Sequence, residues 1–307
     1  MRRLPLLLLV LGCALPAAAR AAAPGLGTWD RSEQRAVVRD GLLPRLFDGR
    51  FHGEQPLTGR QLSDAFLQLG FRLGVPAVVV DDERVTVEAF HRALLKQLGL
   101  GDVATAVREE AARAGLDPPF RFGSEVVARW LGLRFNHPFP YGEKLELSPS
   151  EPITRAEAAW SLAAVLRWSG WEAQAARDAF ADFSLPDYTP AQRAALRIAV
   201  SKIGEPYVWG GESDSGADCS GFVWQVFGSR VGGRATADAY AQAMPRSRRV
   251  SFKRLQPADL MFFDRPVASH VAIALGGGWL INSSSQGVYL QRMDARGDRF
   301  TWGRRLL

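Results

Sequence analysis

The chain has 307 residues, 47% hydrophobic and 23% charged, which excludes a disordered protein and is typical of about two domains with ordinary cores. Residues 24–189 carry 19 basic and 23 acidic side chains, a net charge of −4, whereas residues 190–307 carry 16 basic and 9 acidic, a net charge of +7. A basic domain suits anionic polymers or phospholipid head groups, although a solvated basic face without a partner explains the charge equally well. The sequence shows no nucleic-acid-binding motif.

Residues 1–23 are typical of a secretory signal peptide. Arg2 and Arg3 form a charged start, residues 4–11 an apolar run interrupted only by a proline, and residues 14–23 a small-residue region with several Ala-x-Ala cleavage options. We therefore expect export to the periplasm, cell wall or extracellular space. Cys13 is an alternative lipoprotein-processing site, but its early position fits that role poorly. No later apolar run reaches the ~20 residues of a transmembrane helix.

Residues 24–182 are predicted to form a mainly α-helical domain in which three helices begin alike. Thr58, Thr86 and Thr154 each stand two or three residues before a glutamine or glutamate, and an apolar helical period follows. The pattern resembles S-layer homology repeats, with residues 153–157 as the closest match and residues 49–51 similar to the loop before a repeat. The resemblance implies three stacked helical units that attach to secondary cell-wall polymer. The alternative is a generic helical domain that positions the C-terminal part.

Residues 183–189 are rich in turn formers and are predicted to be a linker. After them, Thr189 and Gln192 make a capping box with Pro190 at the first helical position. This pattern predicts a helix over about residues 190–203 that ends at Gly204.

Cys219 is the only cysteine left once residues 1–23 are removed. In an oxidising compartment an unpaired cysteine indicates an intermolecular bridge or a reactive thiol, with a buried inert cysteine as the alternative. The apolar period after it predicts a helix with Asp218 as N-cap and Cys219 in the first turn. There the helix dipole and unpaired N–H groups are expected to lower the thiol pKa.

Four short apolar segments near residues 259–264, 269–275, 279–283 and 288–290 predict an antiparallel sheet of hairpins. Alternation places His270 on one sheet face with Ala272, and a helix packed on that face would bring Cys219 beside it. A thiolate–imidazolium pair needs a third polar group to orient the ring. Asn282 is the best-placed candidate, and Asp264 and Gln286 are weaker ones. Taken singly, His270 also fits a structural strand histidine, and Asn282 a turn former.

Residues 206–211, 218–221, 255–263, 270–273 and 281–288 together resemble, in this order, the motifs of the NlpC/P60 family of papain-like cell-wall cysteine peptidases. The resemblance covers about residues 190–307 and implies an α+β fold, with the cysteine helix packed on an antiparallel sheet. It implies the roles of nucleophile for Cys219, general base for His270 and orienting group for Asn282. Tyr207 would support the oxyanion. The resemblance further implies substrate contacts for three residues: Asp218, Ser220 and Trp209.

By this resemblance, the expected activity is hydrolysis of peptidoglycan stem peptides at a γ-D-glutamyl bond to the diamino acid, without metal or cofactor. Two positions depart from the family pattern: Ala258 replaces a glycine, and residues 233–237 replace a Leu-Pro-Arg-Thr-like segment. Both bear on subsite specificity. Two alternatives remain: a wall-anchored binding or scaffold protein with an inactive peptidase fold, and an acyltransferase on the same fold.

Overall fold

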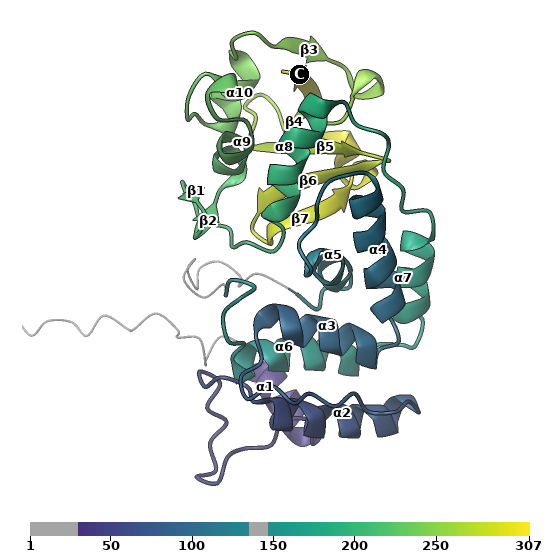
Figure 1. Ribbon diagram of the computed structural model, residues 1–307. Coiled ribbons are helices and arrows are strands. Elements are labelled where there is room, and N and C mark those ends of the chain that lie inside the picture. The colour runs from purple at the N-terminus through teal and green to yellow at the C-terminus, as the bar shows by residue number, and fades with distance from the viewer. Residues whose placement is uncertain (1–29, 135–146) are drawn as a thin grey trace, which may run out of the picture.

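The computed structural model describes residues 30–134 and 147–307, so the predicted signal peptide and Cys13 lie outside the described residues. Figure 1 shows a helical part and, above it, a sheet-containing part. The helices of the first part are α1 (Arg31–Arg39), α2 (Gly59–Leu73), α3 (Val87–Gln97), α4 (Gly101–Arg113), α5 (Phe122–Trp130), α6 (Arg155–Leu166) and α7 (Glu172–Ala181).

The three predicted threonine caps are confirmed in the helical part. The side chains of Thr58, Thr86 and Thr154 accept hydrogen bonds from the backbone N–H groups three residues on, at the first turns of α2, α3 and α6. Each cap satisfies a backbone donor that the helix itself leaves unpaired. The repeated motif is therefore a repeated local structure.

The residues just before these caps close a ring of backbone hydrogen bonds. Leu57 N–H donates to Ile153 O at 2.8 Å, Ile153 N–H to Val85 O at 2.9 Å, and Val85 N–H to Leu57 O at 3.4 Å. All three side chains are completely buried. The starts of α2, α3 and α6 thus meet at one apolar centre, although they are far apart in sequence.

The second part begins with the predicted capping box, which is present at Thr189 and Gln192. Its elements are α8 (Pro190–Ser201), β1 (Glu212–Ser213), β2 (Gly216–Ala217), α9 (Cys219–Phe227), η2 (Gly228–Val231), α10 (Ala237–Gln242), β3 (Arg248–Val250), η3 (Phe252–Arg254), β4 (Leu260–Phe263), β5 (His270–Gly276), β6 (Trp279–Ser284), β7 (Gly287–Arg292), η4 (Asp294–Arg299) and β8 (Phe300–Arg305).

The main sheet is antiparallel with strand order β3-β8-β4-β5-β6-β7. The four predicted strands correspond to β4–β7, and the predicted α+β class is confirmed. Strands β3 and β8 were not predicted because they are arginine-rich and short of apolar alternation. They are strands only because β8 pairs with β4, and β3 with β8.

The two faces of the sheet pack differently. Val271 and Ile273 of β5 belong to the large core that also contains Phe222 of α9, whereas Ala272 and Ala274 belong to a separate small cluster. The expectation that the cysteine helix covers the His270 face is therefore wrong. The branched side chains of the opposite face bury more apolar surface under the helix than the alanines would.

Helix α5 joins the two parts (Figure 1). Its Arg129 donates from Nε to Glu125 Oε2 at 3.1 Å and from Nη1 to the carbonyl of Gln286, in the turn between β6 and β7. Just before α5, Arg121 donates to Ile203 O at 2.9 Å and to Ser201 O at 2.8 Å. One helix of the first part therefore holds two segments of the second.

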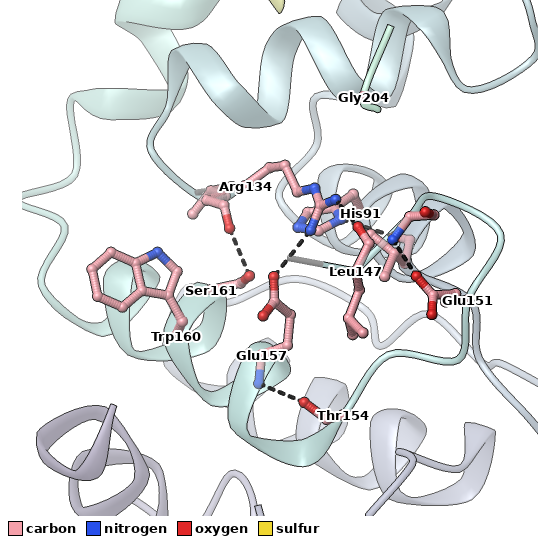
Figure 2. A network of polar contacts seen from close by, with 12 residues as sticks. His91, Arg134, Leu147, Glu151, Thr154, Glu157, Trp160, Ser161 and Gly204 are labelled. Atoms are coloured by element: carbon pink, nitrogen blue, oxygen red, sulfur yellow. Dashed lines mark hydrogen bonds and ion pairs between the residues drawn. The ribbon is translucent and has the colours of Figure 1, made fainter. Parts of the chain in front are cut away.

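Glu125 is the charge on which these contacts converge. Burial alone would raise its pKa, yet the guanidinium groups of Arg134 and Arg129 hold that pKa below its ordinary value. Figure 2 shows Arg134 continuing toward Glu157, at 3.0 Å, and toward the carbonyl of Leu147. Gly204 lies against Glu125 so closely that an added Cβ would stand 2.7 Å from the carboxyl carbon. The buried charges of Glu157, Arg134 and Glu125 thus connect α6 of the helical part to Gly204, near the start of the sheet-containing part.

Breaking this chain at Arg129 should be costly. In Arg129→Gln the buried Glu125 carboxylate loses one of its guanidinium partners, so we expect the free energy of unfolding to fall by about 3–5 kcal/mol. Adding Glu125→Gln should recover part of the loss, because no under-compensated carboxylate remains. Urea unfolding of the wild type, both single variants and the double variant measures the coupling; simple additivity of the two losses would contradict the interpretation.

Ala258, which replaces the family's glycine, has a φ of +67°. It is buried, and its N–H donates to Ala274 O at 2.8 Å, so the backbone is held in the left-handed region, which costs a non-glycine residue about 1–2 kcal/mol.

We therefore expect Ala258→Gly to raise the free energy of unfolding, by about 1 kcal/mol after the greater chain entropy of glycine is subtracted. Ala199→Gly, within α8, is the matched control and should lower it by a similar amount. Denaturant unfolding of both variants checks the signs, and a loss of stability in Ala258→Gly would refute the strain.

Candidate active site

Cys219 begins α9 and is 9% exposed. Asp218 caps the helix, its Oδ1 accepting the Gly221 N–H at 2.6 Å. The Cys219 sulfur accepts backbone N–H groups of Ser220, in its own helix, and of Val271, in β5. Because Val271 follows His270 directly, the thiol lies at the start of the strand that carries the imidazole.

Burial raises the pKa of the Cys219 thiol above its ordinary value, and the Val271 and Ser220 N–H groups oppose this shift only in part. The expectation of a lowered thiol pKa at the helix start is therefore wrong, because desolvation outweighs the backbone donors. A thiol in this position is protonated near neutral pH, so its reactivity depends on a neighbouring base.

The register of β5 and β6 explains why a sulfur fits here. The two strands pair from Gly276 and Trp279 to Ile273 and Ile281, and no pairing is recorded beyond that point. Val271 lies past the end of this ladder and gives its N–H to Cys219. The divergence of the two strands leaves room for the first turn of α9.

His270 and Asn282 are brought together across the same two strands. His270 Nε2 lies 2.8 Å from Asn282 Oδ1, and Asn282 Nδ2 donates to Tyr289 O at 3.3 Å. Since the amide nitrogen faces a carbonyl, its oxygen must face the histidine, and this oxygen can only accept. Nε2 therefore carries a proton, and in the neutral form of the ring the lone pair is on Nδ1.

The two weaker candidates have other contacts. Asp264 accepts from Arg299 Nε at 2.6 Å and from the Ser269 hydroxyl, and these hydrogen bonds, the one from Arg299 foremost, lower the pKa of its carboxyl. Gln286 lies in the turn between β6 and β7, with its N–H donating to Ser284 Oγ at 3.4 Å. Asn282, completely buried beside the ring, has the better position of the three.

Tyr207 and Trp209 lie in the loop between α8 and β1. Tyr207 is partly buried, whereas Trp209 is 79% exposed. Asp218 ties this loop to the cysteine helix, because its Oδ2 accepts the Gly210 N–H at 3.0 Å. The loop and the thiol therefore share one anchor.

Asp218 and Ser220 form a network with Arg234, a residue to which no role was assigned from the sequence. Arg234 Nη2 donates to both Asp218 oxygens at 3.0 Å, and its Nη1 donates to Ser220 Oγ at 2.8 Å. Its Nε also pairs with Glu212 at 3.2 Å. Arg234 lies within residues 233–237, where this sequence departs from the family pattern. Its partner Asp218 is 16 residues away, too far for local sequence spacing to indicate the contact.

In the part of the chain that the structure describes, no group of three or more His, Cys, Asp and Glu side chains is arranged to hold a metal ion. Over the same residues, every helix is too short or too polar to span a bilayer.

These observations define a class: an α+β domain in which a thiol at the start of a helix hydrogen-bonds the backbone of a strand, next to a histidine of that strand whose ring an amide orients. Residues 204–303 match the model of the NlpC/P60 family, and this part of the chain is an NlpC/P60 domain.

Similar proteins share this domain. The chain is 34% identical over 119 residues to a probable endopeptidase p60 of Listeria grayi, covering 38% of this chain and 22% of that protein. It is 32% identical over 99 residues to the probable peptidoglycan endopeptidase LytE of Bacillus subtilis, covering 31% and 28%. A solved structure of the peptidoglycan hydrolase RipB from Mycobacterium tuberculosis is 28% identical, with a TM-score of 0.33, over 38% of this chain and 65% of that one. The chain thus spans only 22% and 28% of these two curated relatives.

Glu205, two residues before Tyr207, gives the site a pH-dependent neighbour. Burial raises the pKa of its carboxyl from 4.5 to about 7, although the Lys202 ammonium, 3.6 Å away, opposes the shift. The folded state therefore binds a proton that the unfolded state releases between these two values.

We expect this carboxyl to make stability fall as the pH rises from about 4.5 to about 7. Glu205→Gln cannot ionise, so its free energy of unfolding should depend less steeply on pH in that window. Glu109→Gln, at an exposed position, is the control and should keep the wild-type slope. Denaturant unfolding at half-unit pH steps measures the slopes; equal slopes for wild type and Glu205→Gln would contradict the assignment.

Proposed function

We propose that this chain is a cysteine peptidase that hydrolyses peptidoglycan stem peptides. The observation that supports it most strongly is the His270–Asn282 hydrogen bond, which makes Nδ1 the basic nitrogen whenever the ring is neutral. The next residue, Val271, hydrogen-bonds the buried Cys219 thiol through its backbone. Domain relatives named as endopeptidases or as peptidoglycan hydrolases support the substrate class.

In the proposed reaction, His270 Nδ1 takes the proton from Cys219 Sγ, and the thiolate attacks the scissile carbonyl carbon to form a C–S bond. The imidazolium then gives its proton to the leaving amine nitrogen as the C–N bond breaks. Water, deprotonated by His270, attacks the resulting thioester and releases the acid and the thiol. The Cys219 N–H and Tyr207 are proposed to stabilise the oxyanion.

The raised thiol pKa gives His270 a definite task. Because Cys219 is largely protonated at rest, proton transfer to His270 has to accompany substrate binding or attack. Asn282 holds the ring by an uncharged oxygen and so orients it without fixing the imidazolium by charge. In this proposal, activation of Cys219 depends on the orientation of the His270 ring rather than on a permanent thiolate–imidazolium ion pair.

The finer parts of the proposal rest on the family resemblance. We propose cleavage at a γ-D-glutamyl bond to the diamino acid, export of the protein to the cell wall or periplasm, and substrate contacts from Asp218, Ser220 and Trp209. Since Asp218 and Ser220 already bind Arg234, a substrate group would meet the three side chains as one unit.

A wall-binding role for the helical part is a second proposal. The closed ring at Leu57, Val85 and Ile153 favours three related units, as the resemblance to S-layer homology repeats implies. Attachment to secondary cell-wall polymer would hold the peptidase near its substrate.

Digestion of purified peptidoglycan and of defined stem peptides, read by mass spectrometry, tests the peptidase proposal. Cys219→Ala should lower turnover at least about 1,000-fold, because it removes the thiol that is proposed to form the acyl intermediate. Cleavage that persists in this variant would falsify the thiol mechanism, and wall binding without cleavage by either protein would favour a scaffold role.

The same assay measures how much Asn282 contributes to kcat. Asn282→Ala removes the acceptor for Nε2 and should lower kcat by about 10–100-fold, whereas Asn282→His retains a nitrogen acceptor and should lose less. Equal losses in the two variants would mean that Asn282 acts by packing rather than by orienting the ring.

A further inference from the structure

The outer edge of the main sheet carries arginines in directly opposed positions. Strand β3 pairs with β8 so that Arg248 stands opposite Arg305 and Arg249 opposite Arg304. Like charges opposite one another destabilise an antiparallel pair, and here two such pairs follow in succession. Because successive residues of a strand point to opposite faces, the two pairs lie on opposite sides of the sheet, and an anion bound at the edge would relieve the repulsion of the pair that it contacts.

A cavity of about 300 Å³ lies at this edge. It is lined by Arg248, Arg249, Val250, Arg254, Gln256 and Arg305. We call the four arginines of this lining, Arg248, Arg249, Arg254 and Arg305, the arginine edge. Guanidinium groups present several donors in a planar fork, which suits phosphate oxygens.

The carboxylates nearby neutralise only one of these charges. Asp259 accepts from Arg305 at 2.8 and 2.7 Å. Across residues 30–134 and 147–307, no ion pair is recorded for Arg248, Arg249 or Arg254. The arginine edge therefore keeps a substantial positive charge after its internal pairing.

Arg304, beneath the edge, adds to the field. It is buried and donates to neutral acceptors: the carbonyls of Ala241 and Gln242 and the hydroxyl of Ser247. Burial first, and then the charge of Arg249, lowers the pKa of its guanidinium. These two cations thus act on each other.

Arg249 is also held in place. Its guanidinium carbon lies 4.4 Å from the ring centre of Trp302. Stacking on an aromatic face leaves the N–H edges of a guanidinium able to bind an acceptor, and it reduces the entropy lost when a ligand binds.

The shape of the charged region favours a linear polymer over a lipid surface. Residues 246–254 contain five cations and no acidic residue. Phe252, 41% exposed, is the one large exposed hydrophobic side chain among them. A membrane-inserting face normally presents several apolar side chains beside its cations. A row of cations along a strand instead matches a chain with repeating anionic groups.

We propose that the arginine edge binds phosphate groups of a linear anionic wall polymer with phosphodiester repeats. The proposal of phosphate binding rests on the four arginines that line the cavity, while the choice of a wall polymer rests on the proposed function. Binding at this site would keep the sheet-containing part attached to the polymer.

Isothermal titration of the whole chain with pyrophosphate and with poly(glycerol phosphate) tests the proposal. We expect both to bind, and Arg248→Gln/Arg249→Gln to weaken polymer binding at least about tenfold and to reduce the slope of log K against log salt by about 1–2. Both positions are exposed, and a thermal melt confirms folding. Arg50→Gln/Arg230→Gln removes the same charge at exposed positions outside the cavity and should retain binding.

Equal weakening in the two double variants would overturn the site, because only overall charge would matter. Absence of binding by wild type would also overturn it. Duplex DNA or phosphatidylglycerol vesicles that bind as tightly as the polymer, with the same dependence on Arg248 and Arg249, would overturn the choice of a wall polymer. None of these measurements requires hydrolysis, so failure of the peptidase proposal would be seen separately in the stem-peptide assay.

Discussion

The hydrogen bond from His270 Nε2 to Asn282 Oδ1 is the contact on which the geometry of the candidate site depends. It selects the tautomer, and it exists because β5 and β6 pair in one register near Ile273 and then diverge. The same divergence lets Cys219 accept the Val271 N–H. A shift of one residue in this pairing would turn the two side chains to opposite faces and leave no orienting group beside the ring.

The site depends on the helical part as well as on its own sheet. Arg121 donates to the Ile203 carbonyl, at the start of the loop that carries Tyr207. Arg129 donates to the Gln286 carbonyl, in the turn that follows β6. Glu125 sets the position of Arg129, and its own charge is maintained by Arg134. The positions of Tyr207 and Asn282 are thus coupled to packing around α5, which is why the two parts form one structural unit.

Charged side chains are paired differently in two regions of the sheet-containing part. Around the candidate site, cations form ion pairs: Arg234 pairs with Asp218 and Glu212 beside the cysteine helix, and Arg299 pairs with Asp264, which also binds Ser269. At the β3–β8 edge, among the described residues, only Arg305 of the four cavity-lining arginines has a recorded ion pair. The high net charge of residues 190–307 is therefore unevenly distributed, concentrated in part on a strand edge at one side of the sheet.

Local sequence signals determined the elements whose stabilising contacts are short-range. Thr58, Thr86, Thr154 and Thr189 predicted helix starts because a cap bonds within three residues. Short apolar segments predicted β4–β7 because these strands are buried along most of their length. Motif order pointed to Cys219, His270 and Asn282 as one set. The tertiary structure decided the rest: which sheet face α9 covers, the raised pKa of the Cys219 thiol, the ion pair between Arg234 and Asp218, and the formation of strands β3 and β8. Each of these depends on desolvation or on partners distant in sequence, and neither leaves a periodic trace along the chain.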